Sequence, residues 1–578
     1  MFKNISNVLS KIYGFVDILL ITFLIFDFGF EDTVSTWFDH KTLFFTLIII
    51  SLIIFNVLRF IYSHNMSLKK MLKANILILV ITLIASGITF SYSDDFDRLY
   101  NTNLVIDTGL ILYFFLRLTS LLRKLYALYY NPTILFVGSF AVTGFIGAFL
   151  LMLPNATTHG ISFIDALFTS ISAVCVTGLI VLDTATDFTF MGKTVIICLI
   201  QLGGIGMLTF TSFFAFFFKQ GASFREGMNV GSFMDSENLQ NVMRFAMRVV
   251  AFTVGIEVVG ALLIYWFIAD IPEIENKAFF SVFHSISAFC NAGFSTFSQG
   301  LSDAAISHAY GFQWIIMHLI ILGGLGYNIV FNFLKYVSDF VINSITHRRI
   351  HSPVRVLTLN SRIVIITTAI LLTVGSFFFF FTEAHRAFAH ESTLGRVTSA
   401  AFTSVTARTA GFNTYDFASL SMPAILFVIF LMWIGASPGS TGGGIKTSTF
   451  ALATLNIISI AKGKERIELR GRKINNQSVK RAFAIICISL MVIGSGVLMI
   501  LFFEEDYSLI QIAFEVFSAF STVGLSLGIT ASLSIGSKYV LIVVMFLGRI
   551  GLLNLLIGML KHVEAHSYEY PEENILIN

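Results

Sequence analysis

The chain has 578 residues, of which 56% are hydrophobic, 15% aromatic and only 12% charged, where a soluble protein carries about 25% charged residues. So few polar side chains cannot cover a water-soluble body, and the composition therefore indicates an integral membrane protein. The net charge of +3 is small and none of the four cysteines forms a CxxC pair, which argues against nucleic-acid binding, a disulfide framework and a zinc site.

About twelve apolar runs along the chain are long enough to be membrane spans, because a bilayer core of about 30 Å takes roughly 20 helical residues to cross. The first run is too long for a cleavable signal and no small-residue cleavage site follows it. We therefore expect an all-α polytopic membrane protein. The runs cover residues 13–30, 43–62, 74–92, 104–122, 132–153, 194–218, 246–269, 312–334, 363–382, 422–456, 482–503 and 538–560.

Basic residues gather in alternate loops, most densely between residues 462 and 481, and the intervening loops are acidic, as at Asp94, Asp270 and Glu504. Cytoplasmic loops carry the excess of Lys and Arg, so the alternation predicts that both termini are cytoplasmic. The acidic outer loops fit two interpretations. They are either ordinary solvated surface or a negative mouth that concentrates cations before they enter a pore.

Four short semi-polar segments between the spans share one pattern around a glycine. Residues 170–179 (SISAVCVTGL) and 285–294 (SISAFCNAGF) agree at most positions, and residues 403–412 and 516–525 are related to them. The four glycines are Gly178, Gly293, Gly411 and Gly524, separated by 115, 118 and 113 residues. Each downstream span has a further glycine 24 to 31 residues later, at Gly203, Gly323, Gly442 and Gly548.

This periodicity predicts four copies of a helix, a re-entrant segment and a second helix. The expected division of the chain is an N-terminal block at 1–128, a repeat region at 129–562 and a C-terminal tail at 563–578. The repeats cover approximately residues 129–220, 240–340, 360–460 and 480–562.

Irregular backbone at membrane depth is tolerated only where protein buries it or where it lines a water-filled cavity. Four such segments around one axis would supply that cavity, and their carbonyl oxygens would replace the hydration shell of a cation. Glycine suits the turning point because it accepts a positive φ and lets the backbone approach the ion. The repeat therefore predicts a cation pore with one filter built from four loops.

Three motifs, at residues 173–179 (AVCVTGL), 201–206 (QLGGIG) and 404–414 (SVTARTAGFNT), resemble those of the Trk/Ktr/HKT superfamily of potassium transporters. The resemblance extends over roughly residues 130 to 562 and is to the TrkH and KtrB membrane subunits. In that family, glycine at all four filter positions accompanies potassium selectivity, whereas serine at the first accompanies sodium transport in some plant members.

The resemblance implies potassium uptake through a selectivity filter that binds K⁺ at its backbone carbonyls. The implied filter residues are Val176, Thr177 and Gly178; Asn291, Ala292 and Gly293; Thr409, Ala410 and Gly411; and Thr522, Val523 and Gly524.

A Gly- and Pro-rich stretch at residues 435–446 (GASPGSTGGGIK) interrupts the tenth expected span. It nearly matches a phosphate-binding loop, but Ile445 separates the glycine from the lysine and no soluble strand precedes it, so we reject ATP binding. The helix must break here, either as a packing kink or, as the resemblance implies, as an intramembrane loop that obstructs the pore beneath the filter and moves on gating. The implied gate residues are Gly435, Ser437, Gly439, Ser440, Thr441, Gly442, Gly443, Gly444, Lys446 and Arg549.

Arg549 lies within the last expected span, far from both of its ends. A charge at the bilayer centre costs about 2.5–3.5 kcal/mol to insert, so this side chain should face the pore or a partner. The resemblance places a comparable arginine below the filter, where it repels cations. Arg408 fits structural support of the third loop and tuning of the ion path equally well.

By the resemblance, the chain binds no cofactor of its own. K⁺ is the transported ion, and nucleotide acts only through a cytoplasmic TrkA- or KtrA-like nucleotide-binding regulatory subunit docked on the basic inner loops. The other expected partners are a second copy of this chain, giving a homodimer, and membrane lipid, with no nucleic acid. The expected location is the cytoplasmic (inner) membrane of a prokaryote.

The N-terminal block departs from the family pattern, because TrkH carries two extra spans before the repeats and KtrB none, whereas about four are expected here. Arg117 and Arg123 hint at a voltage sensor, but two arginines are too few for a gating helix. We expect the block to be a peripheral packing or dimer-interface extension.

Three alternatives stand beside potassium uptake. A sodium or non-selective monovalent cation channel or symporter would share the architecture. A secondary transporter of an organic solute predicts inverted repeats, whereas these four run in one orientation. A membrane enzyme is not expected, because His284, His318 and His385 belong to no HExxH motif or paired-carboxylate constellation. The sequence leaves open whether transport is channel-like or coupled to a proton or sodium gradient.

Overall fold

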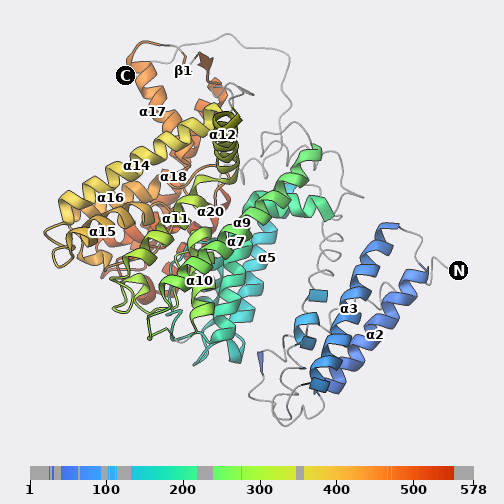
Figure 1. Cartoon of the computed structure of the whole chain (residues 1–578). Coiled ribbons are helices and arrows are strands. Elements are labelled where there is room, and N and C mark those ends of the chain that lie inside the picture. Colours follow the sequence, from blue (N-terminus) through green and yellow to red (C-terminus); the bar gives the residue numbers. More distant parts are fainter. Residues whose placement is uncertain are drawn as a thin grey trace.

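The computed structural model describes residues 41–62, 66–92, 132–217, 239–346 and 357–551, except 275, 465 and 470, together with scattered positions between 22 and 30 and between 102 and 113. The described chain is helical throughout (Figure 1), apart from one antiparallel pair of two-residue strands, β1 (Glu468–Leu469) and β2 (Arg472–Lys473). The expectation of an all-α fold is confirmed.

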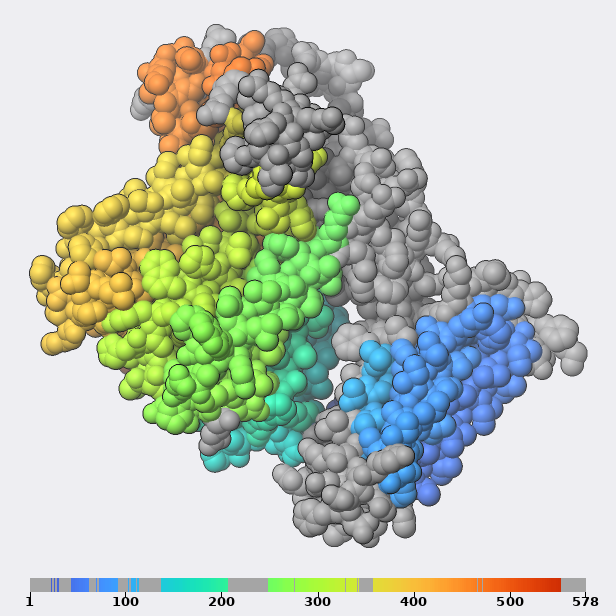
Figure 2. Space-filling view, in the orientation of Figure 1, coloured from blue at the N-terminus to red at the C-terminus, as the bar shows by residue number. Residues whose placement is uncertain are grey.

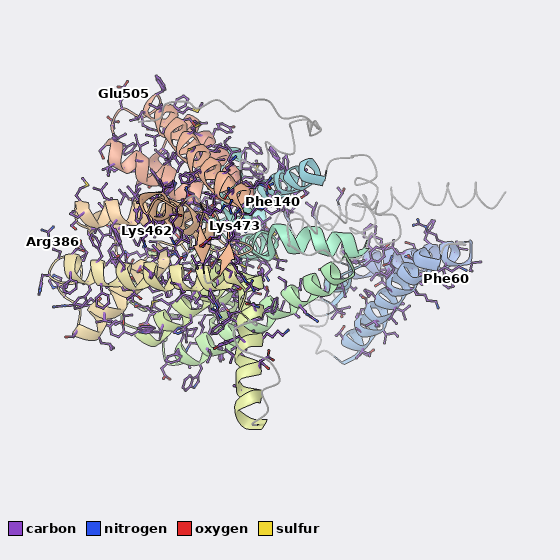
Figure 3. All side chains as sticks on the ribbon, turned by 90° about the horizontal axis from the view of Figure 1, so that it is seen from above. Phe60, Phe140, Arg386, Lys462, Lys473 and Glu505 are labelled. Carbon is purple, nitrogen blue, oxygen red and sulfur yellow. The ribbon has the colours of Figure 1, made fainter. Side chains whose placement is uncertain are left out.

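The N-terminal block contributes two long helices, α2 (Lys41–Tyr62) and α3 (Met66–Tyr92), which pack side by side around Phe45, Ile49 and Leu79. They form a separate blue group beside the rest of the molecule in the ribbon and space-filling views (Figures 1 and 2). Seen from above, Phe60 of this pair lies at the opposite edge of the molecule from Arg386 and Glu505 (Figure 3).

The rest of the N-terminal block lies largely outside the described residues, and with it Arg117 and Arg123 and most of the expected spans at 13–30 and 104–122.

From residue 132 onward, one order of elements occurs four times. A long helix is followed by a short, mostly buried helix, an irregular loop and a further helix. The first helices are α5 (Pro132–Leu151), α9 (Leu239–Phe267), α14 (Leu359–Glu383) and α18 (Asn476–Leu501). The short helices are α6 (Phe163–Val174), α10 (Lys277–Cys290), α15 (Thr393–Thr406) and α19 (Leu509–Ser521). The last helices are α7 (Phe190–Phe217), α11 (Tyr310–Leu325), α16 (Met422–Trp433) and α20 (Ile535–Ile550).

Each short helix begins at a residue whose side chain accepts a backbone N–H of the first turn, which satisfies a donor that the helix itself leaves unpaired. The capping residues are Ser162, Asn276, Ser392 and Ser508, the last within a capping box with Gln511. A single 3₁₀ turn precedes or follows each short helix, at η2 (Pro154–Ala156), η3 (Gly300–Ser302), η4 (Phe417–Ser419) and η5 (Thr530–Ser532).

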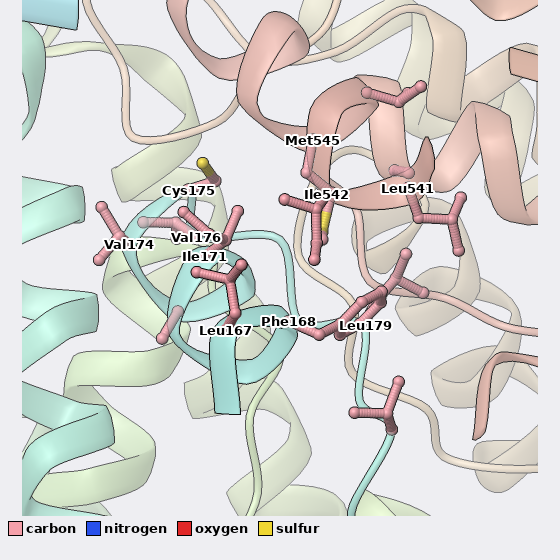
Figure 4. Close-up of a cluster of buried hydrophobic side chains, with 14 of the residues drawn as sticks. Leu167, Phe168, Ile171, Val174, Cys175, Val176, Leu179, Leu541, Ile542 and Met545 are labelled. Carbon is pink, nitrogen blue, oxygen red and sulfur yellow. The ribbon is translucent and has the colours of Figure 1, made fainter. Parts of the chain in front are cut away.

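The last repeat packs against the first and closes the arrangement. Leu541, Ile542 and Met545 of α20 face the side chains of α6 and its loop in one buried cluster (Figure 4). At the edge of the same contact, the Lys538 ammonium lies 2.8 Å from a carboxylate oxygen of Asp165. Four repeats in a closed order surround a common centre.

Within the described residues, five helices are long and apolar enough to cross a membrane, or six if one bent pair counts as a single span. The expected span at 312–334 was wrong as a straight helix: α11 ends at Leu325, and α12 (Tyr327–Thr346) leaves it at 104°. Gly326 forms the break with φ of +85°, a left-handed conformation that costs glycine little.

The expected break in the tenth span is confirmed, because α16 ends at Trp433 and α17 (Thr447–Ala461) begins fourteen residues later. The last expected span, 538–560, is described only to residue 551, and the C-terminal tail lies outside the described residues. Lys462 follows α17 and Lys473 lies in β2, at the end of the molecule where β1 stands in Figure 1.

Candidate functional site

The four repeat glycines form a closed ring. A Cβ atom built on any of them would collide with the carbonyl oxygen that precedes the glycine of the next loop, at distances where real Cβ contacts essentially never occur. The hypothetical contacts are Gly178 to Ala292 O at 2.3 Å, Gly293 to Ala410 O at 2.8 Å, Gly411 to Val523 O at 2.3 Å and Gly524 to Thr177 O at 2.3 Å. Only glycine permits the four loops to approach one another this closely.

The four loops also share an unusual backbone. The glycines have φ between +71° and +92°, and the residues two positions earlier, Val176, Asn291, Thr409 and Thr522, have φ between +50° and +66°. A left-handed conformation costs a non-glycine residue about 1–2 kcal/mol, and such strain gathers at functional sites. Because the residue between each pair does not have a positive φ, left-handed positions alternate along the loop. The loops therefore differ from an ordinary strand, in which every residue has a negative φ.

Hydroxyl side chains just upstream hold the loops in this shape. Ser172 accepts the Gly178 N–H at 3.1 Å and donates to the carbonyl of Leu179 at 2.7 Å. Ser287, Thr406 and Ser518 make related bonds in the other three loops. The sequence reasoning did not assign these residues, although a hydroxyl recurs near that position in all four aligned segments.

The second helices approach the backs of the loops through glycines. A Cβ built on Gly203, Gly323 or Gly548 would lie within 2.0 Å of the carbonyl oxygen four residues before the corresponding filter glycine. Each stands thirteen residues after the first residue of its helix, and in the third repeat that position is Gly435. Gly442 lies after the end of α16, and a Cβ on it would meet the Thr409 side chain of the third loop rather than a backbone carbonyl.

The segment between α16 and α17, residues 434–446, is called here the intramembrane loop. Its ends meet in a bridge between Ile434 and Ile445, and its backbone fills the break between α11 and α12. Ser437 N–H donates to the carbonyl of Gly324 at 3.0 Å, and Tyr327 N–H donates to that of Gly439 at 3.2 Å. Two breaks in separate helices thus supply each other's missing hydrogen-bond partners.

Three successive glycines of the intramembrane loop press against the filter loops. A Cβ on Gly442 would lie 2.0 Å from Thr409 Oγ1, and one on Gly443 would lie 2.3 Å from Thr522 Oγ1. Gly444, with φ of +65°, contacts Ser521. The hydroxyls of Ser521 and Thr522 are buried without a hydrogen-bond partner in the described part of the chain. Few buried polar groups in a folded protein lack a partner.

Arg549 reaches the intramembrane loop. It lies in the last turn of α20, which ends at Ile550 before Gly551 with φ of +81°, and the rest of the expected span, 552–560, lies outside the described residues. Its guanidinium donates to the carbonyl of Gly203 at 2.6 Å and to the carbonyl of Thr441. Fixed at both groups, this arginine joins the first repeat, the fourth repeat and the intramembrane loop.

The side chains of Lys446 and Arg408 also donate hydrogen bonds to carbonyls of the intramembrane loop. The Lys446 ammonium donates to Gly442 O at 2.6 Å, and the Arg408 guanidinium donates to Gly435 O at 3.2 Å. For Arg408 this contact accords with structural support. Backbone carbonyls of the intramembrane loop thus accept hydrogen bonds from Arg549, Lys446 and Arg408.

A cavity of about 300 Å³ opens on the other side of the glycine ring. Two carboxylates, Asp183 and Asp416, line it, whereas the acidic residues expected at the mouth, such as Asp270 and Glu504, do not. The remaining lining comes from the four ring glycines and the segments that follow them: Gly178, Ile180, Thr184, Gly293, Phe294, Ser295, Phe297, Ser298, Gln299, Gly300, Gly411, Asn413, Phe417, Gly524, Leu525, Ser526, Gly528, Thr530 and Ala531.

The sequence reasoning also passed over two buried carboxyl groups. Glu257 of α9 accepts a hydrogen bond from the Gln201 amide at 2.8 Å and adjoins Cys290, the residue before Asn291. Glu515 of α19 accepts hydrogen bonds from three donors behind the wall of the cavity described above. Their signal was an acidic residue inside an otherwise apolar helix. His284 is hydrogen-bonded in the core, and the described residues contain no metal-binding group of three His, Cys, Asp or Glu side chains.

Comparison with known proteins gives consistent matches. The family model described as "TrkH: Cation transport protein" matches residues 123–570. The Ktr system potassium uptake protein B of Bacillus subtilis is 34% identical, over 77% of this chain and 96% of its own. The protein of that name from Vibrio alginolyticus is 36% identical, over 74% and 91%.

Two further matches extend the comparison. The potassium/sodium uptake protein NtpJ of Enterococcus hirae is 35% identical, over 77% of this chain and 97% of its own. The crystal structure of the potassium transporter TrkH from Vibrio parahaemolyticus superposes with a TM-score of 0.57 at 18% identity, covering 90% of this chain and 99% of that one. This last likeness shows a shared fold.

Proposed function

This chain belongs to the TrkH family of cation transport proteins, and from that membership we propose that it takes up K⁺ across the cytoplasmic membrane of a prokaryote. It is an integral membrane transporter and not an enzyme. The observation that carries the proposal is the ring in which each filter glycine abuts the carbonyl of the next loop. A ring of carbonyl oxygens carries partial negative charge throughout, so it favours a dehydrated cation and rejects anions.

The proposed filter comprises the three consecutive residues of each loop that end in the ring glycine. Alternating left-handed backbone supports this assignment, because it is the geometry that directs more than one carbonyl per loop toward a common axis. The filter residues are Val176–Gly178, Asn291–Gly293, Thr409–Gly411 and Thr522–Gly524, with K⁺ bound at their backbone carbonyls.

We assign the gate to the intramembrane loop and Arg549. Conduction requires a path below the filter, and the glycines at 442–444 stand against the side chains of Thr409 and Thr522 there. The hydrogen bonds of Arg549 to Gly203 and the intramembrane loop hold this position. Breaking them would release the loop, since its own backbone makes few regular hydrogen bonds and its glycines offer little side-chain packing.

Regulation and assembly follow from family membership and the charge pattern. We propose a homodimer with both termini in the cytoplasm, regulated by a cytoplasmic nucleotide-binding subunit docked on basic loops such as 462–481. Nucleotide would act through that subunit alone. The N-terminal block, 1–128, lies almost wholly ahead of the matched region that begins at residue 123, and we propose that it packs at the periphery or dimer interface.

A second candidate is uptake of Na⁺ beside K⁺, favoured by the 35% identity to a relative named for both ions. The four filter glycines favour K⁺, because in the family that this chain resembles glycine at all four positions accompanies potassium selectivity.

Ion flux in reconstituted vesicles tests both candidates. A K⁺ gradient should drive flux through the purified full-length chain, and Na⁺ should compete weakly or not at all. Flux of Na⁺ that K⁺ neither replaces nor inhibits would refute potassium uptake, and uptake of both ions at similar rates would establish the second candidate.

A further inference from the structure

The repeats place chemically different side chains at one equivalent position, nine residues before the filter glycine. That position is occupied by Thr169, His284, Phe402 and Glu515. In two repeats the side chain binds the serine two residues after the glycine. His284 Nε2 lies 3.0 Å from Ser295 Oγ, and Ser526 Oγ donates to Glu515 at 2.6 Å.

Both serines line the cavity of about 300 Å³ beside the glycine ring, which is called the outer cavity from here on. His284 and Glu515 therefore stand in the same place behind the cavity wall of the second and fourth repeats. The two differ in chemistry, because an imidazole within the core that faces a carbonyl and a hydroxyl fits its neutral form, whereas a carboxyl group that accepts a backbone N–H and lies against two hydroxyl groups suits its ionised form.

All contacts of Glu515 suit a carboxylate, which only accepts hydrogen bonds. Besides the hydroxyl of Ser526, it accepts from the Leu527 N–H at 3.1 Å and from the Thr530 hydroxyl at 2.8 Å. Its side chain is fully buried. None of the three donors is cationic, and the ion pairs found among the described residues do not include Glu515.

A buried charge without a counter-charge is unfavourable, and the structure offers one place from which a counter-charge can come. Ser526 and Thr530 line the outer cavity, so a cation above the filter is separated from the carboxylate by a single layer of hydroxyl groups. We infer that the transported cation itself balances Glu515, and that Glu515 is a positioning residue that sets the affinity of the outer cavity for that cation. This inference rests on the proposed cation uptake.

Burial distinguishes Glu515 from the other acidic groups at this mouth. Solvent-exposed charges are screened by salt within about 10 Å at 0.1 M, whereas buried charges are screened much less. Asp416 is exposed and lines the same cavity, so it provides a matched charge of the screened kind. His284 provides a matched neutral group at the equivalent position.

The experiment measures K⁺ uptake by the full-length chain in vesicles, as the apparent KM and the maximal rate, at low and high concentrations of an impermeant salt. Glu515→Gln keeps the shape of the side chain and removes its charge. It should raise the KM for K⁺ about tenfold, equal to about 1.4 kcal/mol, at both salt concentrations, with the maximal rate changed less than the KM. Glu515→Asp keeps the charge and should restore most of the affinity.

The two controls separate charge from fold. Asp416→Asn should alter the KM only at low salt, and His284→Gln should leave it near the wild-type value. A Glu515→Gln KM within twofold of wild type, or a Glu515→Asp variant as impaired as Glu515→Gln, would overturn the inference while wild-type uptake remained intact. Absence of K⁺ uptake by the wild-type protein would instead overturn the proposed function.

Discussion

Replacing Gly178 by serine tests the filter assignment most directly. The new Cβ would start 2.3 Å from the carbonyl oxygen of Ala292, so that carbonyl would have to move by about 0.7 Å to reach even the 3.0 Å limit of real contacts. The residue would also keep φ of +86°, which costs a non-glycine residue about 1–2 kcal/mol. Because the displaced group belongs to the ring, the damage should appear in ion selection.

We expect Gly178→Ser to lower the preference for K⁺ over Na⁺ at least tenfold, since each 1.4 kcal/mol lost in differential binding is a factor of ten. Competition between the two ions in vesicle uptake measures this ratio. Gly160→Ala is the matched control, because Gly160 has φ of +72° and nothing within 4 Å of its hypothetical Cβ. It introduces the same backbone strain without a collision. Unchanged selectivity in Gly178→Ser, or an equal loss in Gly160→Ala, would refute the filter reasoning.

Three further outcomes follow from single contacts. Arg549→Gln loses the bond to the Gly203 carbonyl and should raise the maximal K⁺ flux several-fold; an unchanged rate would argue against its gating role. Asp165→Asn leaves the largely buried Lys538 unpaired and should cost about 1–2 kcal/mol, visible as a lower thermal midpoint in detergent. Burial raises the pKa of Glu504, but hydrogen bonds from Ser537 and Ser534 at the start of α20 outweigh this and lower its pKa below 4.5. Its stabilisation is therefore present at neutral pH and lost in acid, so the midpoint difference between wild type and Glu504→Gln should disappear as the pH falls well below 4.5.

The ring was predictable because its cause is local. A glycine that recurs at nearly constant spacing indicates a position where the backbone needs a positive φ. Gly178 and its three counterparts adopt the positive φ that the pattern predicted. The non-glycine residues with positive φ, such as Val176, carry no such signal. Their conformation is imposed by neighbouring loops, and no intrinsic preference of valine would predict it.

Helix breaks were less predictable, because near-identical sequences behave differently. Residues 203–206, 323–326 and 548–551 all read Gly-x-x-Gly, yet α7 continues through its copy, whereas α11 and α20 end within theirs. Whether the helix ends depends on which segment packs against it. The carbonyls of Gly323 and Gly324 accept N–H groups of the intramembrane loop, which compensates the hydrogen bonds that α11 gives up. A contact between segments more than 100 residues apart cannot be read from either segment alone.

The backbone of the glycine ring repeats in all four loops, whereas the side chains around it do not. The ring needs glycine in every loop, since a side chain there would displace the carbonyl of the next loop. Nine residues earlier no such requirement holds, and Thr169, His284, Phe402 and Glu515 have diverged in size and charge. This position is therefore where the four repeats can differ in function. By the inference above, Glu515 adds negative potential to the side of the cavity formed by the fourth repeat. A cation above the ring should be drawn toward the fourth loop before it reaches the axis.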